Sequence, residues 1–399
     1  MTTEVHPRER LQRPRNIGRA VVGVVSTTPE SVLDDYPKVL ELADFAGSMD
    51  PGTETLLKLN LSWTKYFPAC SSQPWQLEGL LRGLHGAGLA RQRLTAVENK
   101  TVVTDPMKGA QLNSWMPVLE AYGVPFQPLT EVEWTVYDFG DELLKLNHIF
   151  PEGIEIPKPY IGRQIIHLPT MKTHGHSIMT GAVKNAFGGL LKEVRHYAHK
   201  YIHEVLVDLL LMERQLHPAT FAVMDGTVCG NGAGPRTMIP YVGNRILASS
   251  DSVAIDAISA KMMGFDPMEI PFLRMAHERG LGVADPKDIE IVGEDIRGVD
   301  YGFTSKKSLV IWGDQMLRLG ALRKLEHLLL HSPLMVWAPF ASNVYHDLMW
   351  YPTVGRSRIR SFEKTAWGQY LEARYRRGRP DVPPEMQAEM QAETQGDPS

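Results

Sequence analysis

Cysteine is nearly absent from this chain. Its 399 residues include only Cys70 and Cys229, which lie far apart in the sequence. Two isolated cysteines cannot form a disulfide framework, a zinc module or a four-cysteine iron–sulfur site. We therefore expect no iron–sulfur cluster, and the low cysteine content predicts a reducing, cytoplasmic location.

Strong net charge, long apolar runs and the best-known catalytic motifs are also missing. The net charge of −4 gives no general electrostatic attraction to nucleic acid. No segment approaches the ~18 consecutive apolar residues of a membrane span. The chain contains no P-loop, Rossmann fingerprint, serine nucleophile elbow or metalloprotease helix. The sequence thus predicts neither a nucleic-acid partner nor a membrane partner, and it disfavours the commonest nucleotide-binding and hydrolase mechanisms.

Short apolar strands alternate with helices along most of the chain. This alternation predicts an α/β fold with mainly parallel sheets flanked by helices, in two α/β segments. In the first segment we expect strands at 20–26, 55–61 and 94–97, and helices at 30–44, 74–88 and 112–122. In the second we expect strands at 163–168, 221–224, 245–248 and 289–292, and helices at 199–216, 253–263 and 271–279.

Changes in composition place the boundaries. We expect a flexible N-terminus at 1–16, an N-terminal α/β segment at 17–139, a connection at 140–159, a second α/β segment at 160–295, a C-terminal helical appendage at 296–376 and a disordered tail at 377–399. The tail is rich in proline, glutamine and glutamate, which disfavours a packed core. The appendage contains Trp312, Trp337, Trp350 and Trp367. We expect these rings to pack on the main body, with a homodimer contact as an alternative use.

The stretch 167–189 carries the strongest functional signal. A strand ends at Pro169, a polar loop follows, and helical character resumes near Met179. In open α/β sheets, ligands bind beyond the carboxyl ends of strands, and a helix N-terminus favours anions. This connection between a strand and a helix is therefore the expected place for an anion-binding crevice.

Four basic side chains fall within this connection: Lys172, His174, His176 and Lys184. The lysines would hold or polarise a carboxylate or phosphate, and the histidines would move protons near neutral pH or bind a metal. A single lysine beside a histidine is usually solvated surface. Several such groups in one connection favour a functional site.

A divalent transition metal is the candidate cofactor. His196, His199 and His203 are spaced to share one helix face, where imidazoles can meet a metal. A solvent-facing helix is the alternative. Asp225 ends an apolar strand and could bind metal or accept a proton, although an Asp-Gly turn explains it too. The predicted metal ligands are His174, His203 and Asp225.

The remaining candidates would contact the substrate: Lys58, Asn60, Thr180, Asn185 and Gly234. Lys58 and Asn60 end another predicted strand and would bring a further cation to the crevice. Gly234 belongs to a glycine-rich turn that could let the backbone approach a ligand, although such a turn is a weak signal by itself.

These motifs resemble the DUF362 family. The matching segments are L-P-x-x-K-T-H at 168–174, T-G-A-V-K-N-x-F-G at 180–188, an aspartate–glycine stretch at 223–227, a Gly-Pro turn at 232–235 and a strand-to-helix element at 247–256. Residues 57–61 resemble the family's Lys-Pro-Asn segment, with Leu59 in place of proline. The resemblance covers roughly 55–295 and implies a role for His203, but the family name assigns no activity. The segment 180–184 is also similar to a stretch of the lactate-racemase family, whose lysine tethers a nickel-pincer cofactor beside proton-exchanging histidines.

Two classes of function follow. The first is an enzyme that binds a small anionic substrate and uses acid–base chemistry, with or without a metal. Its catalytic groups would be Lys172, His174, His176, Lys184 and Asp225. The second is a non-catalytic protein that binds a cofactor, nucleotide or metal in the same crevice. Several histidines around the lysines favour catalysis, because anion binding alone does not need groups that titrate near pH 7.

Overall fold

Ten strands form one central sheet in the computed structural model, which describes residues 20–101, 104–140, 142–192, 198–305 and 344–395. The main path follows the order β12-β1-β11-β10-β7-β2-β3-β4, and β8 joins at β10 and carries β9. The strands are β1 (Ala20–Ser26), β2 (Thr55–Lys58), β3 (Leu94–Glu98), β4 (Phe126–Pro128), β7 (Gln164–His167), β8 (Thr170–His174), β9 (Ile178–Thr180), β10 (Thr220–Ala233), β11 (Thr237–Ser249) and β12 (Ile289–Gly293). A separate two-stranded sheet contains β5 (Trp134–Tyr137) and β6 (Ile154–Pro157).

Most strand pairs are parallel, which confirms the predicted α/β class. Antiparallel pairing occurs where β11 meets β1 and β10, and where β9 meets β8. The two predicted α/β segments share this one sheet, because β7 of the second segment pairs with β2 of the first. The first half of β10 pairs with β7 and its second half pairs with β8. This branch places β8 just beyond the carboxyl ends of β2 and β7.

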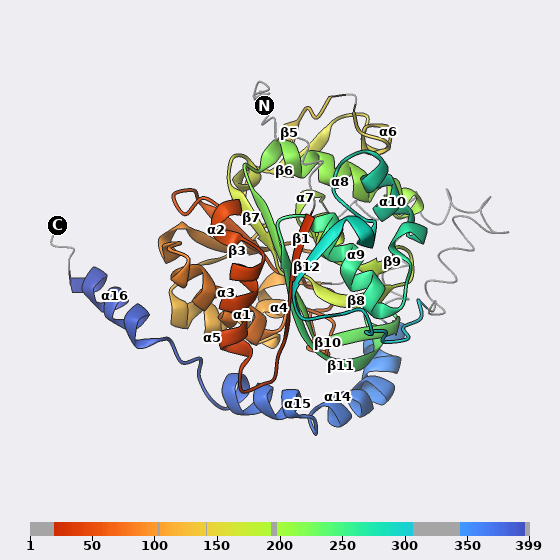
Figure 1. Ribbon diagram of the computed structural model, residues 1–399. Helices are drawn as coiled ribbons and strands as arrows, with labels where there is room; N and C mark the ends of the chain where they lie inside the picture. Colours follow the sequence, from red (N-terminus) through yellow and green to blue (C-terminus); the bar gives the residue numbers. More distant parts are fainter. Residues whose placement is uncertain (1–19, 102–103, 141, 193–197, 306–343, 396–399) are drawn as a thin grey trace.

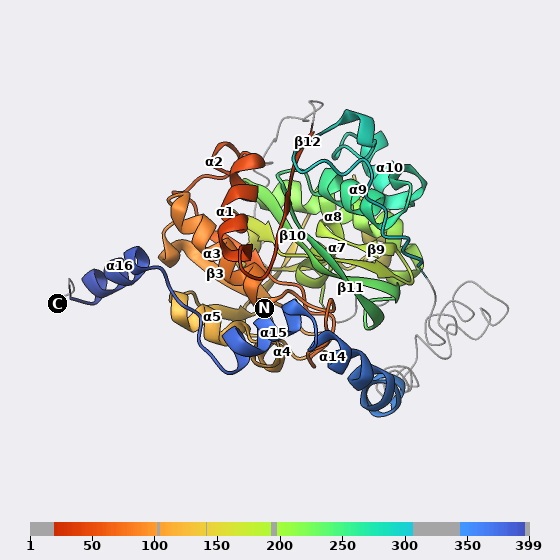
Figure 2. The same ribbon diagram turned by 60° about the horizontal axis from the view of Figure 1, so that its bottom comes forward.

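Helices cover both faces of the sheet, as Figures 1 and 2 show. One face carries α1 (Val32–Leu42), α2 (Phe45–Ser48), α3 (Pro74–Gly86), α4 (Pro106–Leu112) and α5 (Trp115–Tyr122). The other carries α7 (Ala182–Leu190), α8 (Ile202–Leu216), α9 (Ser252–Met263) and α10 (Pro271–Glu278). Successive strand residues serve the two cores, since Leu56 packs with α7 and α9 whereas Leu57 packs with α1 and α3. The short α6 (Leu146–Ile149) lies near β5 and β6.

Two local predictions were wrong. The polar residues after Pro169 form the fully buried strand β8 and its partner β9, not a loop. The helix expected at 112–122 begins only at Trp115, as α5. Leu112 instead ends the separate helix α4, and Ser114 between the two helices adopts a left-handed conformation with φ of 60°. For β8, tertiary contacts override the local pattern.

The C-terminal region wraps around the edge of the body. It contains η8 (Val344–Gly355), α14 (Arg356–Phe362), α15 (Ala366–Tyr370), η9 (Leu371–Arg376) and α16 (Pro384–Gln395), seen along the bottom of Figure 1. Trp350 packs near Trp63, and Trp367 packs on Trp75 with ring centroids 5.0 Å apart. Both rings are buried against the main body, as we expected. They therefore expose little surface for the alternative, a homodimer contact. Trp312 lies outside the described residues, as do Trp337 and the N-terminal segment 1–16.

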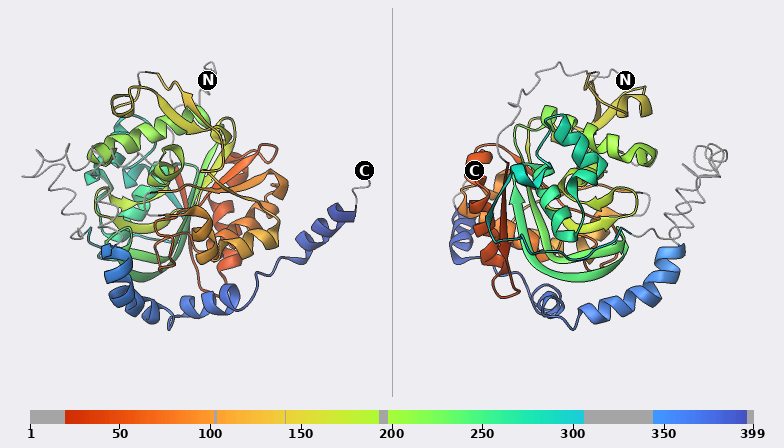
Figure 3. Two further views of the ribbon diagram at one scale, coloured as in Figure 1. Left: turned by 180° about the vertical axis from the view of Figure 1, so that it is seen from behind. Right: turned by 45° about the vertical axis from the view of Figure 1, so that its right-hand side comes forward.

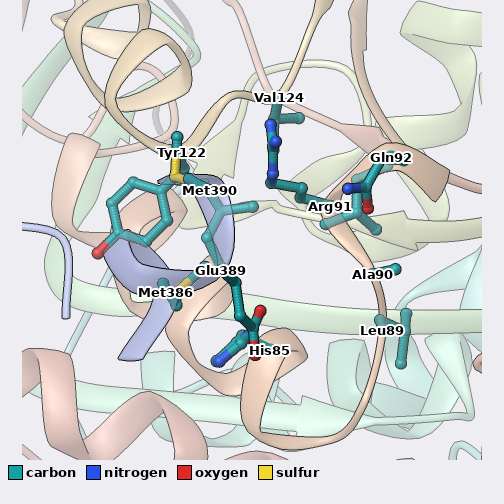
Figure 4. A pocket seen from close by; sticks show the side chains of 12 residues that line it. His85, Leu89, Ala90, Arg91, Gln92, Tyr122, Val124, Met386, Glu389 and Met390 are labelled. Atoms are coloured by element: carbon teal, nitrogen blue, oxygen red, sulfur yellow. The ribbon is translucent and has the colours of Figure 1, made fainter. Parts of the chain in front are cut away.

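The last segment is helical rather than disordered, which corrects the predicted tail at 377–399 for residues 384–395. Figure 3 shows α16 extending from the body at the end of an open connection. Met386 is 5% exposed, and together with Met390 it borders a small cavity that Tyr122 and His85 also line (Figure 4). Two methionines give an otherwise polar segment enough apolar surface to dock. None of the described helices is both long and apolar enough to cross a membrane.

Candidate functional site

Lys172 of β8 lies fully buried beyond the carboxyl ends of β2 and β7. Its ammonium group donates hydrogen bonds to Asn60 Oδ1 at 2.5 Å, Ser62 Oγ at 2.9 Å and the Cys70 carbonyl oxygen at 2.5 Å. Burial lowers its pKa to about 8. A lysine has three N–H donors, and all three are used here. The prediction that Lys172 itself holds a ligand anion therefore does not fit this geometry; its contacts fix the loop after β2.

Lys58 is held in a similar way. Its Nζ forms an ion pair with Glu98 Oε1 at 2.8 Å and donates to the Leu59 carbonyl oxygen at 2.6 Å. Both charged side chains are almost fully buried. Lys58 thus joins β2 to the end of β3 and is a structural cation rather than the substrate contact that we predicted.

Two asparagines connect these lysines to the helices. Asn60 Nδ2 donates to Asn185 Oδ1 at 3.4 Å, and Asn185 Nδ2 donates to the Lys58 carbonyl oxygen at 2.9 Å. Lys58, Glu98, Asn60, Lys172 and Asn185 form what we call the inner polar cluster. The structure brings Lys58, Asn60, Lys172 and Asn185 into contact, and their role in a functional site stays a prediction.

The N-terminus of α7 is already occupied by a carboxylate. Asp256 of α9 accepts hydrogen bonds from the Ala182 and Val183 backbone N–H groups at 2.6 and 3.1 Å. A Cβ atom on Gly181 would overlap this carboxylate, so the glycine allows its close approach. The expected binding of a ligand anion by this helix end is therefore wrong, because Asp256 satisfies the N–H groups that would bind it.

Four basic side chains form a second group, the outer basic cluster, which consists of His174, His176, His199 and Lys184. The rings of His174 and His176 lie 5.8 Å apart, and those of His176 and His199 lie 5.3 Å apart. Phe187 joins them, since its ring lies 5.5 Å from that of His199 and 5.5 Å from Lys184 Nζ. His176, His199 and Lys184 are partly exposed, so this cluster is reachable from solvent.

His174 is held as a neutral hydrogen-bond donor. Its Nδ1 accepts hydrogen bonds from the backbone N–H groups of His176 and Ser177, at 3.1 and 3.2 Å. A nitrogen that accepts in this way carries no proton, so in the neutral ring Nε2 carries it. Burial holds the pKa of His174 well below its usual range, and the nearby charges of Lys184, His176, His199 and Lys172 lower it further. Every charged group that contributes to this shift is basic.

Thr180 and Gly234 lie beside β8. Thr180 is the partner of Lys172 in the β8–β9 ladder, and its Oγ1 is buried without a hydrogen bond. Gly234 packs so closely on the strand that an added Cβ would overlap the Thr173 carbonyl oxygen. The need for glycine at 234 thus follows from chain packing, not from a ligand that approaches the backbone.

The predicted metal ligands are not brought together. Asp225 Oδ1 accepts from the Thr227 N–H and Oγ1, and Thr227 Oγ1 accepts from Trp75 of α3, in a different part of the core. His203 stacks on Phe272 of α10, with the rings 6.1 Å apart. Burial raises the pKa of Asp225 to about 6 and lowers that of His203. Among the described residues, no group of three histidine, cysteine or acidic side chains is arranged to hold a metal ion.

Of the predicted histidine triplet, His199 and not His203 lies beside His176. His199 precedes α8 and faces His176, whereas His203 lies inside α8 and faces α10. His196 lies outside the described residues. Ser62, Glu98 and Glu213 were missed altogether, because each is isolated in the sequence and reaches the site only through the fold. His167 opens the stretch 167–189, and this position was its signal in the sequence.

The middle of the chain matches a known protein family. Residues 55–261, more than half of the chain, match the family described as domain of unknown function DUF362. The protein belongs to this family. The match ends earlier than the resemblance at 55–295 that we inferred from motifs. It includes every residue of the inner polar cluster and of the outer basic cluster.

Two relatives help to place the chain. A protein of Synechocystis sp. named as thylakoid-associated is 25% identical over 176 residues, which cover 43% of this chain and 52% of that protein. The chain thus matches about half the length of this curated relative. A crystal structure of a protein from Thermotoga maritima is 13% identical, with a TM-score of 0.32, and the match covers 54% of this chain and 55% of that one.

Proposed function

We propose that the outer basic cluster binds a small anionic molecule, a carboxylate or a phosphate, and that the protein moves a proton on it. The supporting observation is the environment of His174. Its low pKa results from burial and from basic neighbours alone. An anion at this place would offset the mutual repulsion of these groups, which makes its binding favourable.

Roles follow from the geometry. Lys184 and the partly exposed imidazoles attract the anion, and His174 donates a hydrogen bond from Nε2 to an oxygen of the bound molecule. A neutral imidazole fixed in this tautomer polarises an oxygen without being protonated. His176, whose ring adjoins those of His174 and His199, accepts the proton that leaves the bound molecule and returns it at the end of the step.

Nuclear magnetic resonance of histidine-labelled protein tests this proposal. Inorganic phosphate and malonate, added separately, should shift the ring signals of His174, His176 and His199. His148 of α6 is exposed and serves as the internal control. Proton exchange is then followed with malonate and lactate in D2O. Binding without any catalysed exchange would favour the alternative, a non-catalytic binding protein. The absence of any site-specific shift would refute both.

The likeness to lactate racemase rests on residues 180–184 alone and stays a prediction. In the structure, Lys184 lies at the start of α7, over the Phe187 ring. Mass spectrometry of the native protein would test it, because a tethered cofactor adds mass to Lys184. No step of the proposed chemistry depends on such a group.

Association with a membrane surface is a second candidate, and it opposes the predicted absence of a membrane partner. The Synechocystis relative is named as thylakoid-associated. In this chain, Leu348 and Met349 of η8 are 70% and 59% exposed, and the next helix presents the exposed Arg356 and Arg360. Apolar side chains beside arginines suit an anionic lipid surface.

Vesicle sedimentation tests this second candidate. The protein should pellet with anionic vesicles more than with zwitterionic ones, and Leu348→Ser combined with Met349→Ser should abolish the difference. Leu112→Ser is the matched control, because Leu112 of α4 is also exposed, at 52%. Equal sedimentation with both vesicle types, or equal loss in both variants, would exclude the surface as a lipid-binding site.

A further inference from the structure

A buried chain of four hydrogen bonds links Lys172 to Glu213 of α8. Lys172 Nζ donates to Asn60 Oδ1 at 2.5 Å, and Asn60 Nδ2 donates to Asn185 Oδ1 at 3.4 Å. Asn185 Nδ2 lies 3.4 Å from His167 Nδ1, and His167 Nε2 lies 2.7 Å from Glu213 Oε1. The five side chains are at most 8% exposed. These hydrogen bonds therefore connect the loop after β2, α7, β7 and α8 through side chains that are shielded from water.

The direction of this chain is fixed by its two ends. A charged lysine can only donate, and an ionised glutamate can only accept. Asn185 has an additional anchor, because its Nδ2 also donates to the Lys58 carbonyl oxygen at 2.9 Å. The same amide nitrogen must then donate to His167 Nδ1. His167 is thereby held with its proton on Nε2, which donates to Glu213.

The row of hydrogen bonds has a positive charge at Lys172 and a negative charge at Glu213, with three neutral side chains between them. A buried ammonium or carboxylate is costly unless hydrogen bonds compensate it. Each amide and the imidazole here donate toward Glu213 and accept from the side of Lys172, so each bond polarises the next in the same sense. Removing the carboxylate would remove the acceptor that orients His167, and the orientation of both asparagines would lose its support.

We propose that Glu213 and His167 are positioning residues that orient Asn185 and Asn60 and thereby fix the Lys172 ammonium group beneath the outer basic cluster. This inference rests on the proposed function in one respect, namely that Lys172 is one of the charges acting on His174. It assigns roles to two residues on β7 and α8 that lie away from the outer basic cluster.

The first test determines which ring nitrogen of His167 carries the proton in the ligand-free protein. Long-range proton–nitrogen correlation spectra distinguish the two neutral tautomers of histidine. The expected result is a protonated Nε2 and a bare Nδ1 at neutral pH. A proton on Nδ1 would require Asn185 to turn its oxygen toward the ring, which reverses the chain and overturns the proposal.

The second test compares Glu213→Gln with Glu204→Gln. Both changes remove one negative charge from α8, but Glu204 lies at the partly exposed first turn of the helix, away from the chain. Nitrogen-detected titration of labelled lysine should show the Lys172 pKa falling in Glu213→Gln, because the side chains that hold its acceptor Asn60 Oδ1 lose the carboxylate that orients them. It should stay unchanged in Glu204→Gln. Equal values in both variants would refute the positioning role.

A third comparison separates positioning from simple packing. His167→Gln keeps one acceptor and one donor, whereas His167→Leu keeps only the apolar volume. The glutamine variant should retain the native Lys172 titration and the leucine variant should not. If the leucine variant does not fold, the tautomer and the Glu213 comparison still decide the matter. Failure of phosphate binding with a native tautomer and a native Lys172 titration would refute the proposed function alone.

Discussion

Replacement of Lys184 by glutamine separates anion binding from folding. The substitution keeps most of the side-chain length and removes the positive charge. A hydrogen bond to a charged group contributes about 1.5–3 kcal/mol. Since about 1.4 kcal/mol corresponds to a factor of ten in affinity, the dissociation constant of inorganic phosphate should rise roughly 10- to 150-fold. Raising the ionic strength should weaken native binding in the same direction, because Lys184 is partly exposed and its charge is screened.

The same substitution should change stability very little. Lys184 Nζ lies 5.5 Å from the Phe187 ring centroid, and a cation–π contact at such a site contributes about 0.5–1 kcal/mol. Glutamine and lysine have nearly equal helix propensities, so α7 itself is not weakened. The free energy of unfolding in urea should therefore fall by no more than about 1 kcal/mol.

Calorimetric titration with phosphate and urea denaturation measure the two quantities on the same sample. Lys364→Gln is the matched control, since Lys364 lies exposed between α14 and α15. It should leave both phosphate affinity and stability unchanged. Native phosphate affinity in the Lys184 variant, or an equal loss in both variants, would show that general charge rather than the outer basic cluster attracts the anion.

Three further predictions concern the parts that hold the site. Burial raises the pKa of Asp256 to about 7, above the unfolded value near 3.8, so its stabilisation is present at low pH and lost as the pH rises to about 7. The stability of native protein relative to Asp256→Asn should therefore fall between pH 4 and 7 in urea unfolding, and a constant difference would contradict this. Glu78 is fully buried and accepts from Arg374 and Tyr375, so Glu78→Gln should cost roughly 3 kcal/mol and expose the C-terminal region to protease. Met386→Ser should speed hydrogen exchange in α16 while the sheet stays protected, whereas unchanged exchange would show that α16 is not docked by this side chain.

The α/β class could be predicted because it depends on local pattern. Strands such as β1 and β12 are apolar and bounded by turn residues, and helices such as α9 begin with a capping aspartate and end at glycine. The strand β8 was missed for the opposite reason. Its sequence Thr-Met-Lys-Thr-His is mostly polar, and it can be buried only because distant groups, including Asn60 and Ser62, satisfy its lysine.

The sequence predicted which residues lie near one another better than it predicted the contacts that each of them makes. Spacing within one motif placed Lys172, His174 and Lys184 together, since they share a short connection between strand and helix. It could not show that Lys172 has three acceptors, or that Asp256 caps α7 from another helix. Such facts depend on which segments pair across the sheet, and no local pattern encodes them.

The inner polar cluster contains buried charges, whereas the outer basic cluster contains partly exposed ones. In the inner polar cluster, the ammonium groups of Lys58 and Lys172 are held by acceptors from the chain, so neither can bind an anion without breaking contacts that are buried. Burial is the main cause of the low pKa of His174, and the charge of Lys172 lowers it further together with Lys184, His176 and His199. Burial and these basic neighbours keep His174 neutral, and in the proposed function the partly exposed outer basic cluster binds the anion. We therefore expect substitutions of Lys172 to alter the proposed proton transfer by changing the protonation and position of His174, and not by removing a contact to the proposed anion.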